Sequence, residues 1–98
     1  MAENFYVNTV GAVSSTRLSE AIDLGKVLTE ESKAAGSVRA SIGTIMTGNN
    51  AGSVVFQQFF NSLNDFANVM DAFAVSNTYG EIIQTGLKVT MRNVAKFC

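Results

Sequence analysis

The sequence predicts an α+β fold with the element order strand, helix, strand, strand, helix, strand. Segments rich in β-branched and aromatic residues alternate with two segments of helical periodicity, and no proline interrupts either kind. The 98 residues are enough for one domain, so we expect residues 1–98 to form a single unit. Because right-handed crossovers are strongly favoured, we expect a four-stranded antiparallel sheet with its helices on one face.

The first half of the chain predicts a strand followed by a long helix. Residues 4–13 combine aromatic and β-branched side chains, which is typical of a strand. The hydroxyl residues 14–16 can cap the N-terminus of the helix that follows. That helix is expected to run to about Ala35 and to end at Gly36, since glycine accepts the left-handed conformation at a helix end.

A hairpin and a second helix are predicted next. Residues 37–47 and 53–60 indicate two strands, and the Gly- and Asn-rich residues 48–52 between them favour a turn. Asn61 or Ser62 can cap the second helix, which has an apolar stripe at helical spacing.

The last part of the chain predicts a break, a short helical segment and a final strand. Residues 76–80 are expected to interrupt the second helix, and residues 81–85 to add a further turn or two. Residues 87–97 then alternate as a strand does. One predicted side consists of Leu87, Val89, Met91, Ala95 and Phe97, and the other of Lys88, Thr90, Arg92 and Lys96.

The first and third strands predict a homodimer. Both carry large apolar residues at consecutive positions, Phe5-Tyr6-Val7 and Val54-Val55-Phe56, so both of their faces favour burial. One layer of helices covers only one of these faces. Charged residues make up 15% of the chain against about 25% in an average domain. We therefore expect a second copy to cover the other face of the sheet.

Composition argues against several function classes. The net charge of −1 gives no basic excess for binding nucleic acid. No histidine is present, which removes the commonest general base and metal ligand, and no cofactor or metal is expected. Cys98 is expected to be an inert, exposed end. The sequence begins without the pattern of a signal peptide and has no membrane-spanning run, so we expect a cytoplasmic protein that does not bind membranes.

The element order is the ferredoxin-like one, and the chain resembles the dimeric α/β-barrel superfamily over nearly its whole length. The resemblance rests on Phe5-Tyr6-Val7-Asn8, residues 48–52, the run from Phe59 to Phe66, and Asn77-Thr78-Tyr79. This superfamily includes antibiotic-biosynthesis-monooxygenase-like proteins, haem-degrading enzymes, polyketide cyclases and stress-responsive proteins. The resemblance implies a dimeric barrel made by two paired sheets, and the fold alone does not choose among these activities.

Four residues are candidates for a site. In the haem-degrading and quinol-oxidising members that the chain resembles, an asparagine lies on the first strand in the cleft between sheet and helices, and Asn8 is close to that position. Tyr6 shares a face with Asn8 and could orient a ligand or act as a weak acid. Arg92 could bind an anion, and Tyr79 could close the mouth of a pocket. Each of the four also has a purely structural alternative. Of Gln57 and Gln58, which point to opposite faces, one is expected to enter a cavity.

Two functions remain open from the sequence, and with them whether the protein is an enzyme. The first is binding of a small apolar ligand in a cleft between sheet and helices, because a few polar residues lie among many apolar ones. The second is a cofactor-free monooxygenase or cyclase acting on a phenolic or polyketide-type substrate. The haem members of the superfamily need a histidine and the quinol-oxidising ones often use a tryptophan, and this chain has neither.

Overall fold

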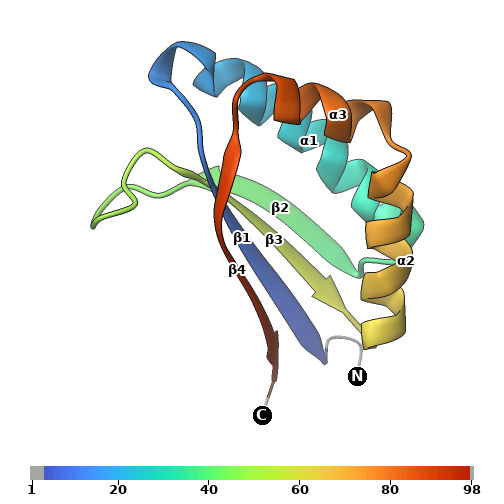
Figure 1. Ribbon diagram of the computed structural model, residues 1–98. Coiled ribbons are helices and arrows are strands. Elements are labelled where there is room, and N and C mark those ends of the chain that lie inside the picture. The colour runs from blue at the N-terminus through green and yellow to red at the C-terminus, as the bar shows by residue number, and fades with distance from the viewer. Residues whose placement is uncertain (1–3, 98) are drawn as a thin grey trace.

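The computed structural model describes residues 4–97, so Cys98 lies outside the described residues (Figure 1). The strands are β1 (Phe5–Ala12), β2 (Arg39–Thr44), β3 (Val54–Phe60) and β4 (Lys88–Lys96). The helices are α1 (Leu18–Ala35), preceded by the 3-10 turn Ser15–Arg17, then α2 (Leu63–Ala74) and α3 (Asn77–Gln84). Among residues 4–97, no helix has the length and apolar character needed to cross a bilayer.

The four strands form one antiparallel sheet in the order β2-β3-β1-β4. β1 and β3 are central, and all three helices lie on one face of the sheet, as Figure 1 shows. The predicted ferredoxin-like fold is therefore confirmed. We call the face toward the helices the inner face and the opposite one the outer face.

The core lies between the inner face and the helices. Val7 and Phe60 from the central strands are fully buried, and they meet Ala21 and Leu28 of α1 and Val69 of α2. Odd-numbered residues of β1 and even-numbered residues of β3 point inward, because Val7 pairs with Gln58 and strand side chains alternate.

Helix α1 ends where the sequence predicts and begins by another means. Gly36 has a φ of 143°, and its N–H donates to the carbonyl oxygens of Ser32 and Lys33. At the start, no hydroxyl caps the helix, because Ser14 Oγ and Thr16 Oγ1 bond to each other at 3.0 Å. The expected hydroxyl cap of this helix is therefore wrong.

An ion pair marks the first turn of α1. Arg17 Nε donates to Glu20 Oε1 at 2.7 Å. This hydrogen bond lowers the pKa of the Glu20 carboxyl and raises that of Arg17. Both side chains are about half exposed, so solvent screens the pair and it contributes little to stability.

The second helical region differs from the prediction in its second half. Ser62 caps α2 as expected, with its Oγ accepting from the N–H of Asp65 at 3.2 Å. The break comes earlier than predicted, at Val75 and Ser76, and residues 77–80 are helical. Ser76 causes this shift, because its Oγ accepts from the N–H of Tyr79 at 3.2 Å and caps α3.

The predicted alternation of the last strand is also wrong in part. The pairing of β1 with β4 shifts between Val10, which lies opposite Met91, and Gly11, which lies opposite Val89. Thr90 is the extra residue of this β-bulge. Because of this bulge, Val89 and Arg92 both face the helices. In a regular strand, two residues three positions apart would face opposite sides.

Candidate ligand-binding site

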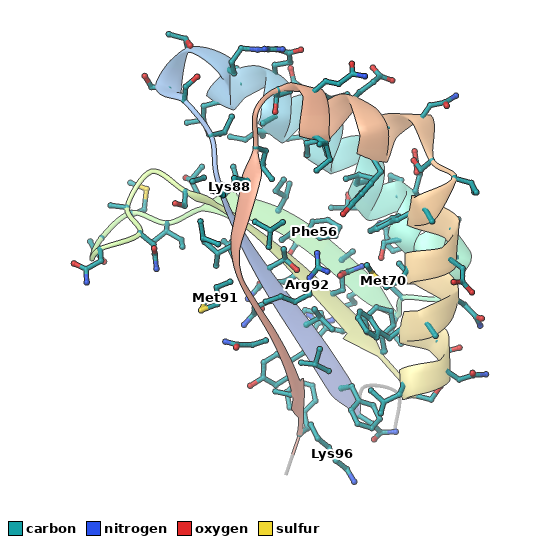
Figure 2. The ribbon with its side chains drawn as sticks, in the orientation of Figure 1. Phe56, Met70, Lys88, Met91, Arg92 and Lys96 are labelled. Carbon is teal, nitrogen blue, oxygen red and sulfur yellow. The ribbon has the colours of Figure 1, made fainter. Side chains whose placement is uncertain are left out.

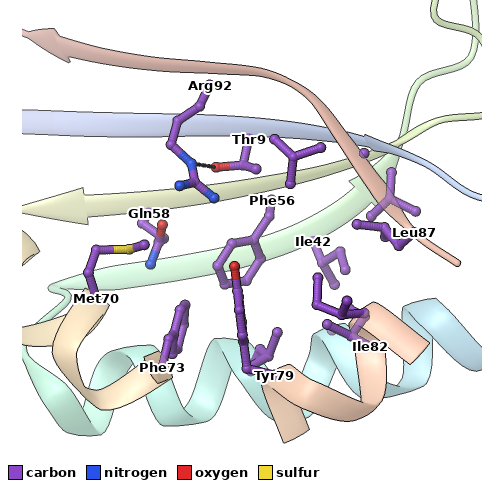
Figure 3. A pocket seen from close by; sticks show the side chains of 16 residues that line it. Thr9, Ile42, Phe56, Gln58, Met70, Phe73, Tyr79, Ile82, Leu87 and Arg92 are labelled. Carbon is purple, nitrogen blue, oxygen red and sulfur yellow. Dashed lines mark hydrogen bonds between the residues drawn. The ribbon is translucent and has the colours of Figure 1, made fainter. Parts of the chain in front are cut away.

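A pocket lies between the inner face of the sheet and the helices (Figure 3). Its lining is mostly apolar and comes from all four strands and all three helices. The apolar lining is Gly11, Gly25, Leu28, Ile42, Val54, Phe56, Met70, Phe73, Ile82, Ile83, Leu87 and Val89. The remaining lining residues are Thr9, Gln58, Tyr79 and Arg92.

The pocket has the size of one small molecule. Its volume is about 60 Å³. An apolar cavity of about 150 Å³ in another protein binds benzene. The pocket is smaller than this cavity and opens to solvent beside Ile83 and Arg92, so it admits at most one aromatic ring.

Two close approaches shape the walls of the pocket. A Cβ at Gly25 in α1 would come within 2.0 Å of the Cδ1 atom of Ile42, so the missing side chain lets α1 lie close to β2. A Cβ at Gly11 in β1 would come within 2.7 Å of Leu87. Gly25 thus allows α1 to lie close to β2, and Gly11 allows Leu87, which directly precedes β4, to lie close to β1.

Arg92 is the charged residue of the pocket lining. In Figure 2 its side chain extends from β4 toward the helices, on the side where Phe56 lies, whereas Met91 points the other way. Its Nε donates to Thr9 Oγ1 on β1 at 3.1 Å, as the dashed line in Figure 3 shows. The ion pairs among residues 4–97 are Arg17 with Glu20 and Lys33 with Glu30, so Arg92 has no carboxylate partner within the described chain.

Gln58 contributes a buried amide to the wall opposite. The side chain is 2% exposed, and its Nε2 donates to Ser32 Oγ of α1 at 2.9 Å. Ser32 Oγ in turn bonds to Ser37 Oγ at 2.5 Å. This chain of hydrogen bonds fixes the orientation of the amide inside an apolar region.

Tyr79 is held from both sides. Its ring stacks on Phe73 at a centroid distance of 5.5 Å and an interplanar angle of 20°. Its N–H is bound by Ser76, whose hydroxyl also donates to Glu31 Oε1 of α1 at 2.5 Å. The ring is thus fixed between α2 and α3, with its hydroxyl end directed into the space seen in Figure 3.

The structure places Tyr6 and Asn8 outside this pocket. Both lie on the outer face of β1, because Val7 and Thr9 take the inward positions. The expectation that Asn8 lies in the cleft between sheet and helices is therefore wrong by one residue, and Thr9 is the polar residue that β1 presents there. Of the two glutamines, Gln58 enters the pocket and Gln57 does not.

The outer face has a polar atom in need of a partner. Within residues 4–97, Asn8 Oδ1 is the buried side-chain oxygen or nitrogen that makes no hydrogen bond. Beside it, Tyr6 packs on Phe97 at 4.9 Å between ring centroids, and Arg39 lies 4.3 Å above the ring of Phe59. This face combines exposed aromatic surface with an unsatisfied acceptor.

The donor set of the pocket suits binding and orientation. Its lining has no carboxylate and no thiol, and no group of three potential metal ligands occurs in the part of the chain that the structure describes. The polar side chains of the lining are the guanidinium of Arg92, the amide of Gln58 and the hydroxyls of Thr9 and Tyr79.

Comparison with known proteins places the chain in a family. Residues 3–97 match the family model described as Domain of unknown function (DUF6854). The chain belongs to this family. A search of curated proteins found no match.

Several solved structures share the fold of this family member at low sequence identity. A protein of unknown function from Bacteroides thetaiotaomicron, described as a possible oxidoreductase, has a TM-score of 0.72 at 13% identity, covering 97% of this chain and 98% of that one. A dimeric ferredoxin-like protein from an uncultured marine organism has a TM-score of 0.69 at 14% identity, with coverages of 99% and 96%. A candidate antibiotic biosynthesis monooxygenase from Nitrosomonas europaea has a TM-score of 0.64 at 16% identity, with coverages of 99% and 91%. These similarities establish the fold.

Proposed function

We propose that this protein binds a small apolar ligand in the pocket between sheet and helices and that it works as a homodimer, one domain per chain, paired through the outer face. The observation that carries the binding proposal is the pocket itself, which is lined by apolar side chains and has a few polar groups at fixed positions. Ligand sites in proteins have this character. The cytoplasmic location expected from the sequence stays a prediction.

The homodimer is supported by the composition of the outer face. Phe97 and Met91 remain 44% and 42% exposed there, and the rings of Tyr6 and Phe59 pack on one another and on Phe97. A second copy would cover these rings and could supply a donor to Asn8 Oδ1. One of the similar structures is described as a dimeric ferredoxin-like protein.

The cofactor-free monooxygenase or cyclase has less support in the geometry. The similar structures described as a possible oxidoreductase and a candidate monooxygenase favour it. However, Tyr6 and Asn8, which were expected to orient its substrate, lie on the outer face. In the pocket, Tyr79 is the weak acid left for proton transfer among the described lining residues.

The binding proposal is tested by blocking the mouth of the pocket. Ile83 lines the pocket and is 44% exposed, so Ile83→Trp adds bulk at the mouth without burying a new group. The probe is toluene, followed by protein-observed NMR of the backbone amides. Toluene is expected to shift amide signals of the lining residues in the wild type and not in Ile83→Trp.

Val27→Trp is the matched control, because Val27 is 48% exposed on α1 and does not line the pocket. This variant should bind toluene as the wild type does. Absence of shifts in the wild type, or equal shifts in both tryptophan variants, would overturn the binding proposal. Oxygen consumption with a panel of quinols distinguishes an enzyme from a binding protein.

A further inference from the structure

We propose that the ligand is a single-ring aromatic acid, bound as its carboxylate monoanion with the carboxylate on Arg92. This inference rests on the proposed binding function and names the class of molecule that the pocket selects. Three features of the pocket carry it: its charge, the direction of the guanidinium and the shape of the apolar wall.

The charge of the lining is a single positive one. Arg92 supplies this charge, and neither the lining nor the rest of the described chain provides a carboxylate partner for it. Arg92 is an exposed residue beside the apolar wall, where a cation without a carboxylate partner attracts an anion more strongly than in bulk water and less strongly than at a buried site. The single positive charge of the lining is balanced by a ligand with one carboxylate.

The hydrogen bond to Thr9 determines which part of the guanidinium is free. Nε is taken up by Thr9 Oγ1 at 3.1 Å, so the side-on pair of Nε and one terminal nitrogen is blocked. The two terminal nitrogens remain, and together they form an end-on fork. A planar carboxylate matches this fork with two parallel hydrogen bonds, whereas a hydroxyl or a single carbonyl uses only one.

The apolar wall fits a flat ring. Phe56 and Phe73 lie 6.3 Å apart at an angle of 43°, and Phe73 stacks on Tyr79. These rings come from β3, α2 and α3 and line the pocket, whose volume of about 60 Å³ is smaller than that of a cavity that binds benzene. A planar guest can stack on or meet the edge of such rings, and a polycyclic guest does not fit without rearrangement.

The test compares benzoate with benzamide, which has nearly the same shape and no charge. Affinities are measured by NMR titration of the pocket amides at low salt, for the wild type, Arg92→Met, Arg92→Lys and Lys96→Met. Benzoate is expected to bind the wild type about tenfold more tightly than benzamide, as charge-assisted hydrogen bonds at a partly exposed site imply. Arg92→Met should remove this preference, with a larger loss of affinity for benzoate than for benzamide, because the benzamide carbonyl uses only one bond of the fork.

Two variants distinguish the bidentate geometry of Arg92 from the effect of its positive charge alone. Arg92→Lys keeps the charge and loses the bidentate geometry, so it should retain only part of the preference. Lys96→Met is the matched control: Lys96 lies on the same strand and points to the same side, with its Nζ 6.0 Å from the ring of Phe5, outside the pocket lining. It removes one positive charge and should keep the full preference.

The wild type alone gives a second readout in case a variant folds poorly. Its benzoate affinity should fall as salt is raised from about 20 to 500 mM, because screening weakens an exposed charge contact, and its benzamide affinity should stay constant. Equal binding of benzoate and benzamide at the pocket would overturn this inference and leave the proposed binding function standing. If neither they nor toluene shift the pocket amides, the proposed function itself fails.

Discussion

Gln58 is a polar side chain surrounded by the apolar core, and its placement depends on one serine. Its Nε2 donates to Ser32 Oγ at 2.9 Å, and both residues are almost completely buried. A buried amide that loses its partner keeps the cost of its lost hydration.

Ser32→Ala should therefore lower the free energy of unfolding by about 1–3 kcal/mol, measured by urea denaturation. Ser19→Ala is the matched control, because Ser19 lies in the same helix and is exposed, so both variants gain the same helix propensity. Equal stabilities of the two variants would show that Gln58 does not depend on Ser32.

At the residue scale the sequence identified part of the candidate site. Arg92 and Tyr79, two of the candidates from the sequence, line the pocket, and their role in binding stays a prediction; Gln58 rather than Gln57 enters the pocket. Thr9 was missed because the choice between Asn8 and Thr9 depends on which face of β1 the helices cover. Strand alternation predicts only that adjacent side chains point to opposite faces. Which of the two faces the helices cover is known from the packing of Val7 in the core.

The element with most influence on the pocket is α3. Its N-cap residue, Ser76, accepts from the N–H of Tyr79 and donates to Glu31 of α1, so one hydroxyl both starts the helix and ties it to its neighbour. Ser62 caps α2 in the same way, and its hydroxyl makes no second side-chain hydrogen bond within residues 4–97.

Ser76→Ala should cost about 2 kcal/mol and Ser62→Ala about 1 kcal/mol, since an N-cap contributes about 1 kcal/mol and Ser76 also loses a charge-assisted hydrogen bond. Urea denaturation measures both. The amide signals of Tyr79 and Ile82 should broaden in Ser76→Ala alone. If the two variants are equally stable, the contact with Glu31 contributes nothing.

Most element positions could be predicted from periodicity and turn residues, and two local features could not. The break between α2 and α3 falls where Ser76 finds a backbone N–H to bind, and several nearby polar residues could equally have done so. The bulge in β4 leaves no mark in the sequence, because Thr90 suits a regular strand as well as an irregular one.

The whole molecule has helices on one face and a sheet open on the other, as Figure 1 shows. That asymmetry was predicted from the preference for right-handed crossovers, and the order β2-β3-β1-β4 has β1 and β3 at the centre, as expected. Pairing of two copies stays a prediction, because it concerns a second chain.

Ser41→Asp tests this pairing. Ser41 is exposed and lies opposite Gln57 on the outer face, so a carboxylate there leaves the isolated fold intact but would be buried unpaired in a dimer. Light scattering at micromolar concentration should show a dimer for the wild type and a monomer for Ser41→Asp. Ser19→Asp on the exposed side of α1 should remain dimeric. A monomeric wild type would contradict the proposal.

Because Thr90 is an extra residue in β4, odd-numbered residues such as Val89 face the helices before it, and even-numbered residues such as Arg92 face them after it. In a relative whose final strand lacks the insertion, the side chain that lies over Thr9 occurs one position earlier than Arg92 does here. If such a relative is aligned to this chain without a gap from residues 87–89 onward, Arg92 is matched to a residue of the relative that points to the outer face. A comparison of homologues should therefore allow a gap of one residue at the insertion, because otherwise the arginine of the proposed anion site would be overlooked.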